Sequence, residues 1–446
     1  MNDDVSASRR EALRQLERIE MDEAYVGLID QEDEDLDRRE RRQVREYVAG
    51  VTRWRRWLDF VLGRLYHGDY GDVELRLRQI LRLGAYELLF THTPSHAAIY
   101  ENVELAKQMI RPGAGRLVNG MLRTLDRDRE HIPDPDSGDR ANDLAIRYSH
   151  PTWVVRRWLD RYGEEDTAEL LEWNNRRPMY SVRANPHKTT IDAFTERLDA
   201  LDAVWVDSPY LDDFVRMKRL QPLIKEGLLD EGLCAVQDES AGLVVRLLDP
   251  QPGETIIDGC AGPGGKATYA AERMQGEGQL IAIDVNDKRV GLVEESAAAQ
   301  GVDDLVETWT GELQTAPDDP DLPRADRVLV DAPCSGLGVL AKRADLRWQR
   351  DPEDLDELTA LQRELLDAAA KLVKPGGLLV YSTCTIEPEE NAEQVTAFLE
   401  RHDDFQLESA EDVLPGEFVT EEGYFASTPQ QHGIDGAFGV RLRRAE

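Results

Sequence analysis

The sequence predicts an α/β protein in which an all-α domain and a small α+β connector precede a Rossmann-like domain, a mostly parallel sheet with an antiparallel C-terminal hairpin. Two observations lead to this prediction. After Asp238, short apolar runs that suit buried strands alternate with helical segments, as in a parallel sheet covered by helices on both faces. Before about Leu125, apolar residues recur at helical spacing instead. We therefore expect domains at residues 1–140, 141–235 and 236–446.

The first of these domains is expected to be entirely helical. Amphipathic stretches run from Ala7 to about Leu125, with an Arg-rich segment at 38–65 and an apolar-periodic one at 75–90. A segment rich in Pro, Asp, Gly and Ser at 131–139 breaks this periodicity and is typical of a linker. Beyond Pro151, helical segments give way to strand-like runs at 180–184 and 203–206, which predict the α+β connector.

The last domain repeats a rhythm of strand, turn and helix. Its expected strands are 255–259, 279–284, 305–309, 327–331 and 377–383, and its expected helices are 266–274, one ending near 300, and 353–372. Apolar runs at 424–426 and 436–442 flank a turn rich in polar residues. They predict an antiparallel hairpin that closes the edge of the sheet.

The composition is strongly acidic. The chain has 88 acidic and 54 basic residues, a net charge of −34, and its lysines number nine against 45 arginines. Most of the excess lies in residues 236–446, which carry 43 acidic and 18 basic side chains. Excess carboxylate with few lysines suits a very salty cytoplasm, where the Debye length falls to about 3 Å at 1 M salt. We therefore expect a halophilic source.

Two further features bear on location and metal content. No apolar run approaches the length of about 18 residues that spans a membrane, and Met1–Asp4 lack the basic and apolar regions of a signal peptide. We expect a cytoplasmic protein that neither spans nor binds a membrane. The four cysteines form no C-x-x-C pair and no zinc spacing, which predicts reduced thiols and no metal site.

Two of the cysteines directly follow predicted strands. Cys334 lies in Asp331-Ala332-Pro333-Cys334-Ser335-Gly336, and Cys384 lies in Ser382-Thr383-Cys384-Thr385. Ligands of an open α/β sheet bind outside the carboxyl ends of the strands, so both residues are expected to face one site. A thiolate in such a place is a candidate nucleophile.

A glycine-rich turn at 258–267 joins the first strand of this domain to its helix. A triphosphate loop would need Gly at position 260 and Ser or Thr at 267, where the chain has Cys260 and Ala267, so that interpretation is weak. The pattern Gly262-x-Gly264-x-x-Ala267 fits a dinucleotide, with Asp284 placed to hold a ribose. S-adenosylmethionine also has a ribose and would bring an electrophilic methyl group to the cysteines. A turn formed for packing alone is the remaining alternative.

Taken together, these motifs resemble the RNA cytosine-C5 methyltransferases, and most closely the bacterial 16S ribosomal RNA enzymes of the Sun (Fmu) type. Further similarities lie at 236–238, 388–391 and 432–436. The resemblance implies that Cys384 attacks carbon 6 of cytosine, that Cys334 helps to resolve the adduct, and that Asp331 contacts the pyrimidine and the cofactor. It implies that S-adenosylmethionine is held by Asp284, by Glu312 or Thr310 at the adenine, and by the loop residues Cys260, Ala261, Gly262, Pro263, Gly264, Gly265 and Lys266.

The N-terminal half resembles the all-α antitermination factor NusB, an RNA-binding module, at 83–88, 101–107 and 116–122. The resemblance therefore implies RNA as the partner, most specifically small-subunit ribosomal RNA, and an enzyme expected to be a monomer. Two alternatives stay open: a non-catalytic RNA-binding or antitermination protein, and a methyltransferase that acts on transfer RNA. A nicotinamide-dependent oxidoreductase would leave the paired cysteines unexplained.

Overall fold

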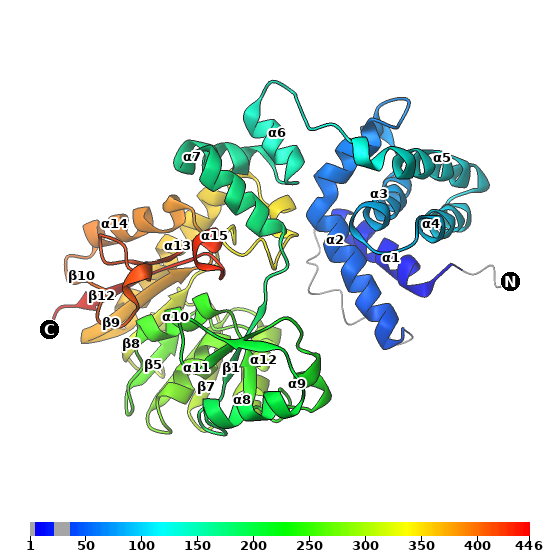
Figure 1. Ribbon diagram of the computed structural model, residues 1–446. Helices are drawn as coiled ribbons and strands as arrows, with labels where there is room; N and C mark the ends of the chain where they lie inside the picture. The colour runs from blue at the N-terminus through cyan, green and yellow to red at the C-terminus, as the bar shows by residue number, and fades with distance from the viewer. Residues whose placement is uncertain (1–4, 22–35) are drawn as a thin grey trace. The chain divides into compact units, whose positions relative to one another are not determined.

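A computed structural model describes residues 5–21 and 36–446 (Figure 1). Met1–Asp4, which bear on the expected lack of a signal peptide, lie outside these ranges. The chain forms two compact units, one of residues 1–176 with Leu340–Arg350 and one of Arg177–Val339 with Asp351–Glu446. Within the described ranges, no helix has both the length and the apolarity that crossing a bilayer demands.

The first unit is helical, as predicted. Its N-terminal helices are α1 (Ala7–Met21), α2 (Arg38–Gly63), α3 (Leu75–Phe90), α4 (Ser95–Met109) and α5 (Pro112–Asp128). Asp37 begins α2 with a capping box, because its carboxylate accepts from the backbone of Glu40 while the Glu40 carboxylate accepts from Asp37 N–H. The apolar faces meet in a core that includes Leu58, Leu81 and Leu122.

Two more helices, α6 (Arg140–Arg147) and α7 (Thr152–Asn175), complete this unit together with segment 340–350. The segment is anchored by Arg347, which is fully buried and donates to the carbonyls of Ser149 and Asn174 at 3.0 Å. Trp348 Nε1 also donates to the carbonyl of Thr52, at 2.7 Å. Six residues beyond Cys334, the chain therefore enters the helical unit. The boundaries expected at 140 and 235 stay predictions.

The second unit begins with a small antiparallel sheet. Its elements are β1 (Tyr180–Ala184), α8 (Ile191–Ala200), β2 (Trp205–Asp207), β3 (Phe214–Met217), α9 (Gln221–Lys225) and β4 (Cys234–Val236). The strand order is β2-β3-β1-β4. The sequence predicted β1 and β2 but missed β3 and β4, because a strand of three or four residues shows too little alternation to be recognised.

The large sheet has the order β10-β12-β9-β8-β5-β6-β7, and β11 pairs with β12. Its elements are α10 (Glu239–Leu248), β5 (Thr255–Asp258), α11 (Gly265–Arg273), β6 (Gln279–Asp284), α12 (Asp287–Gln300), β7 (Val306–Thr310), β8 (Ala325–Asp331), α13 (Pro352–Leu372), β9 (Val373–Thr383), α14 (Ala392–Arg401), β10 (Phe405–Glu408), β11 (Phe425–Ser427) and β12 (Ala437–Arg444). Strands β7, β6, β5, β8 and β9 are parallel, as predicted.

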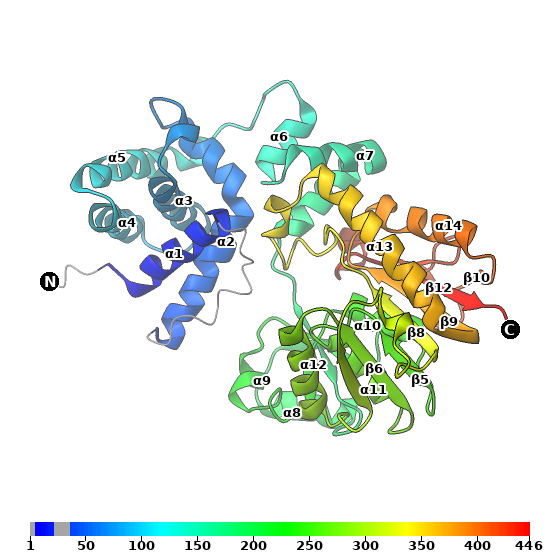
Figure 2. The same cartoon turned by 180° about the vertical axis from the view of Figure 1, so that it is seen from behind.

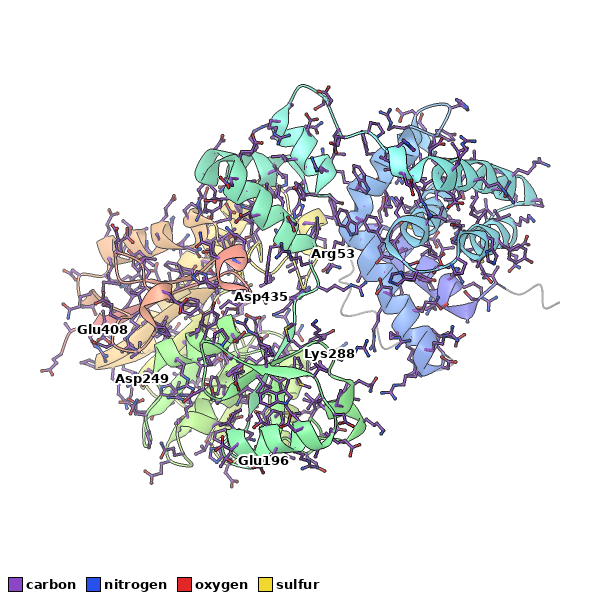
Figure 3. The ribbon with its side chains drawn as sticks, in the orientation of Figure 1. Arg53, Glu196, Asp249, Lys288, Glu408 and Asp435 are labelled. Carbon is purple, nitrogen blue, oxygen red and sulfur yellow. The ribbon has the colours of Figure 1, made fainter. Side chains whose placement is uncertain are left out.

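One detail of the tail prediction is wrong. Strands β11 and β12 do form an antiparallel pair, but β12 also pairs with β9 and does not close the sheet. The edge strand is β10, which pairs with the other side of β12. Its Glu408, labelled in Figure 3, bonds Arg441 and Arg443 of β12 across the pair.

Alternate side chains of each parallel strand enter opposite cores. In β5, Ile256 packs toward α10, α11 and α12, whereas Ile257 packs toward α13 and α14. Figure 2 shows α13 lying along the sheet beside β8 and β9. Because helices cover both faces, the carboxyl ends of the strands are the place where loops can gather chemical groups.

Candidate active site

The structure brings the two predicted cysteines together. Strands β8 and β9 are parallel neighbours with Asp331 opposite Ser382, so the loops that follow them leave the sheet side by side. The sulfur atoms of Cys334 and Cys384 lie 3.3 Å apart, and Cys384 N–H donates to the Cys334 sulfur at 3.4 Å. Both side chains are half-buried.

The environment keeps Cys334 in its thiol form. The hydrogen bond with Cys384 and burial raise the pKa of Cys334 well above its usual value, and the negative charges of Glu390 and Asp331 add to the effect. A protonated Cys334 can donate its S–H to the sulfur of Cys384. The contact would therefore stabilise negative charge on the Cys384 sulfur.

Lys266 and Asp331 form an ion pair that links the glycine loop to the thiol loops. Lys266 Nζ lies 2.6 Å from one Asp331 oxygen, and Ser382 Oγ donates to the other at 2.9 Å. Burial disfavours the charge on Lys266, but the Asp331 carboxylate outweighs it and raises the pKa of the ammonium group. The Asp331 carboxylate is thus held in place at the end of β8.

The glycine loop itself approaches Asp284 at the end of β6. Gly262 N–H donates to Asp284 at 3.0 Å, and a Cβ on Gly262 would lie 2.5 Å from the same oxygen. Gly264 has a φ of +106°, a left-handed conformation that favours glycine, at the start of α11. Between them is Pro263, and Cys260 and Ala261 begin the turn. Close approach to Asp284 therefore requires glycine at position 262, and the left-handed φ favours it at position 264.

Asp258 is a site residue that the sequence analysis missed. It ends β5, is 1% exposed, and its Oδ2 atom has no hydrogen-bond partner among the described residues. Burial, followed by the charge of Asp331, raises the pKa of Asp258 to about 7. The sequence did contain a signal for Asp258, because it is a carboxyl group at the end of the strand that precedes a glycine loop.

These residues fit S-adenosylmethionine. The unpartnered Asp258 oxygen suits an ammonium group, and each Asp284 oxygen has acceptor capacity left for a ribose hydroxyl after bonding Gly262 or Asn286. Thr310 is the last residue of β7 and lies opposite Asp284 in register, and Glu312 follows two residues later. Both residues are exposed. The contact of Glu312 or Thr310 with the adenine stays a prediction.

The remaining cysteines lie apart from this pair. Cys234 is 2% exposed in the core of the small sheet, and burial raises its pKa to about 12. Burial and the charge of Asp258 raise the pKa of Cys260 as well, so it fits a packing role in the loop better than a nucleophile's role. In residues 5–21 and 36–446, no group of three or more His, Cys, Asp or Glu side chains is placed to hold a metal ion.

The parallel sheet and its glycine turn place the chain in the class of Rossmann-like methyltransferases, whose cofactor is S-adenosylmethionine. Within that class, the 16S rRNA methyltransferase RsmB/F family matches residues 245–443. The NusB family matches residues 6–127, and a ferredoxin-like domain of RsmF/B-like methyltransferases matches 150–223.

Individual relatives agree over nearly the whole chain. A probable ribosomal RNA small subunit methyltransferase B of Synechocystis sp. is 36% identical over 412 residues, which are 91% of this chain and 92% of the relative. That of Bacillus subtilis is 33% identical over 442 residues, 97% and 98% of the two chains. A solved structure, titled PH0851, has a TM-score of 0.82 at 27% identity and covers 97% of each chain.

The chain therefore belongs to the family of ribosomal RNA small subunit methyltransferase B. The predictions of an enzyme, of a Rossmann-like fold behind a NusB-like domain and of S-adenosylmethionine as cofactor are confirmed. The non-catalytic, triphosphate and dinucleotide interpretations are accordingly wrong. The roles of individual residues stay predictions.

Proposed function

We propose that this protein methylates carbon 5 of a cytidine in 16S ribosomal RNA and that it does so through a covalent bond between Cys384 and carbon 6 of the base. The observation that carries the proposal is the 3.3 Å contact of the Cys334 and Cys384 sulfurs beside the Lys266–Asp331 ion pair. The substrate rests on the relatives named for the small ribosomal subunit.

A nucleophile is needed because carbon 5 of cytosine is too weakly nucleophilic to take a methyl group directly. When the Cys384 thiolate adds to carbon 6, the ring electrons move toward carbon 5 and the ring nitrogen 3 becomes more basic. Once that nitrogen takes a proton from water, its N–H can donate a hydrogen bond to the Asp331 carboxylate, which Lys266 and Ser382 hold. Bound S-adenosylmethionine supplies the electrophilic methyl group.

Release reverses the addition. Water takes the proton from carbon 5, and the electrons of that C–H bond restore the double bond between carbons 5 and 6. The bond from carbon 6 to the Cys384 sulfur breaks, so that the sulfur departs as a thiolate, and nitrogen 3 returns its proton to water. The Cys334 thiol, 3.3 Å away, can donate its S–H to that sulfur as the negative charge returns. Its raised pKa suits this role, because a donor must keep its proton.

The test is transfer of labelled methyl groups from S-adenosylmethionine to ribosomal RNA by the purified protein, followed by digestion and mass spectrometry of the nucleosides. The proposal predicts 5-methylcytidine at one position of 16S ribosomal RNA. A label found only in transfer RNA would show that transfer RNA, and not 16S ribosomal RNA, is the substrate. A label on another atom or base would refute the proposed chemistry. We further infer that the protein acts in the cytoplasm, since its four cysteines form no disulfide and ribosomal RNA is its expected partner.

A further inference from the structure

A buried carboxylate joins the two loops that carry the thiols. Glu390 follows β9 in a short 3₁₀ helix, Pro388–Glu390, and its side chain is 0% exposed. One oxygen accepts from Ser335 N–H at 2.8 Å, and the other accepts from Ser335 Oγ at 2.5 Å. Ser335 is the residue after Cys334, so the bidentate contact fixes the backbone of the Cys334 loop.

The same cluster reaches the Cys384 loop. Ser335 Oγ lies 2.8 Å from Oγ1 of Thr385, the residue after Cys384. Gln362 of α13 donates both to Glu390, at 3.0 Å, and to the carbonyl of Pro333, at 2.9 Å. Pro333 and Ser335 flank Cys334, so each loop is held one residue from its sulfur.

The cost of burying this charge argues that the arrangement is selected for more than packing. None of the ion pairs among the described residues includes Glu390. Burial raises the pKa of Glu390, and the hydrogen bonds from Ser335 and Gln362 act against that rise. A carboxylate buried without a cation is expensive, whereas an apolar side chain would fill the same space without that cost.

We propose that Glu390 is a positioning residue that sets the relative placement of Cys334 and Cys384. This inference rests on the proposed function for its catalytic consequence, but not for the geometry itself. Glu390 is fully buried, and its hydrogen bonds are to Ser335 and Gln362. It acts through Ser335 and Thr385, and its charge also favours the thiol form of Cys334.

The first experiment separates positioning from simple loss of stability. Glu390→Gln keeps the size of the side chain but replaces one of its two acceptor oxygens with an NH2 group, which cannot accept from Ser335. We expect kcat to fall by about 10- to 100-fold while KM for RNA changes by less than about threefold, because sub-ångström misplacement acts on the chemical step. Glu390→Asp is expected to recover part of the rate.

The matched control is Glu239→Gln. Glu239 is likewise 0% exposed in the same unit and accepts from a serine, Ser181 Oγ, at 3.2 Å and from Arg216 at 2.6 Å, but it has no contact with either thiol loop. Its substitution is expected to lower the melting temperature without a comparable fall in kcat. An equal fall in kcat for both variants at temperatures where both are folded would overturn the positioning role.

The second experiment needs no RNA. Iodoacetamide alkylation of Cys334 and Cys384 is followed across pH in wild type, Glu390→Gln and Glu239→Gln, with each site read by peptide mass spectrometry. Removal of the Glu390 charge is expected to shift the midpoint for Cys334 to lower pH, and the control is expected to leave it unchanged. If the alkylation profiles of both Cys334 and Cys384 matched those of wild type, the proposal would be overturned.

Ser335→Ala tests the proposal even if the Glu390 variants fail to fold. It removes the hydroxyl that joins Glu390 to Thr385 but keeps the backbone bond of Ser335, so a smaller fall in kcat is expected, and an unchanged kcat would count against the proposal. If wild type methylated no cytidine, the proposed function would fail, whereas the alkylation profiles would still decide whether Glu390 controls the thiols.

Discussion

Cys334 and Cys384 stand 50 positions apart in the chain, yet their sulfur atoms lie 3.3 Å from each other. The contact exists because β8 and β9 are adjacent parallel strands and each cysteine follows its strand closely. The distance exceeds the length of a disulfide bond by about 1.2 Å, so the two sulfurs are not covalently joined. One sulfur can bond to a substrate while the other donates to it.

The Asp258 carboxyl group is predicted to make cofactor binding pH-dependent. Its pKa of about 7 means that roughly half of the unliganded protein carries a proton there at neutral pH. An ammonium group placed beside Asp258 favours the carboxylate, so S-adenosylmethionine affinity should rise between pH 6 and 8 and binding should release protons. Calorimetry in buffers of different ionisation enthalpy measures this release.

Asp258→Asn provides the comparison. The amide cannot ionise, so we expect affinity to fall by about tenfold at pH 8 and to lose its dependence on pH, in line with about 1.5 kcal/mol for a hydrogen bond to a charged group. If the wild-type protein bound the cofactor equally well at pH 6 and 8, the placement of the ammonium group at Asp258 would be wrong.

Asp331→Asn is predicted to slow methylation strongly. The substitution keeps the shape of the side chain but removes the charge that pairs with Lys266, 2.6 Å away. We expect kcat to fall by about 100-fold, the lower range for loss of a group that assists proton movement. Ser382→Ala removes only one hydrogen bond to Asp331 and should cost far less. Similar rates for Asp331→Asn and wild type would exclude the proposed contact with the pyrimidine.

His150 should make the helical unit sensitive to acid. The imidazole is fully buried and its Nδ1 lies 2.7 Å from the carbonyl of Tyr148. Burial, and then the charge of Arg347, lower the pKa of His150 well below 6.5. The neutral form is therefore favoured in the folded state, and the stability it contributes is fully present above about pH 6.5 and is lost as the pH falls.

Chemical unfolding at pH 7 and pH 5 tests this. Below pH 6.5, this one group should lower the free energy of unfolding by up to about 1.4 kcal/mol for each pH unit. His150→Gln should be less stable than wild type at pH 7 but should show a shallower dependence on pH. Parallel pH profiles for the two proteins would contradict the assignment.

Glu408 should stabilise the sheet edge at neutral pH. Burial disfavours its charge, but hydrogen bonds from Arg443 and Arg441 prevail and lower its pKa to about 2. The contribution is present above about pH 4.5 and is lost as the pH falls through 2. The side chain is 32% exposed, so we expect Glu408→Gln to cost only about 1 kcal/mol at pH 7. The difference in melting temperature should vanish near pH 2, and its persistence there would contradict the ion-pair origin.

Much of the catalytic unit was predictable because its signals are local. Strand-end positions for Cys334, Cys384 and Asp284 follow from apolar runs that stop at a turn, and parallel neighbours then bring those positions together. The edge strand β10 was not predictable in this way, because its four residues form a strand only by pairing with β12. In that pair, Phe405 lies opposite Arg444. The predicted hairpin of β11 and β12 is present, but its expected place at the sheet edge missed β10 for the same reason.

The residues that support the site could not be predicted, because their roles depend on contacts that form only in the folded structure. Asp258 has an altered pKa only because the sheet buries it and brings Asp331 near. Glu390 appeared only as part of a motif at 388–391, and nothing in the sequence showed that Ser335, Thr385 and Gln362 would meet it. Arg347 likewise gave no sign that it would be buried among backbone carbonyls.

The most direct measurement is mapping of the bond between protein and RNA. Cys334→Ala is incubated with 16S ribosomal RNA and S-adenosylmethionine, separated on a denaturing gel, and the slow-migrating complex is digested for mass spectrometry. We expect an accumulated adduct that joins Cys384 to a methylated cytidine, and no such adduct with Cys384→Ala. Full methylation activity in Cys384→Ala, or an adduct at another residue, would contradict the covalent mechanism.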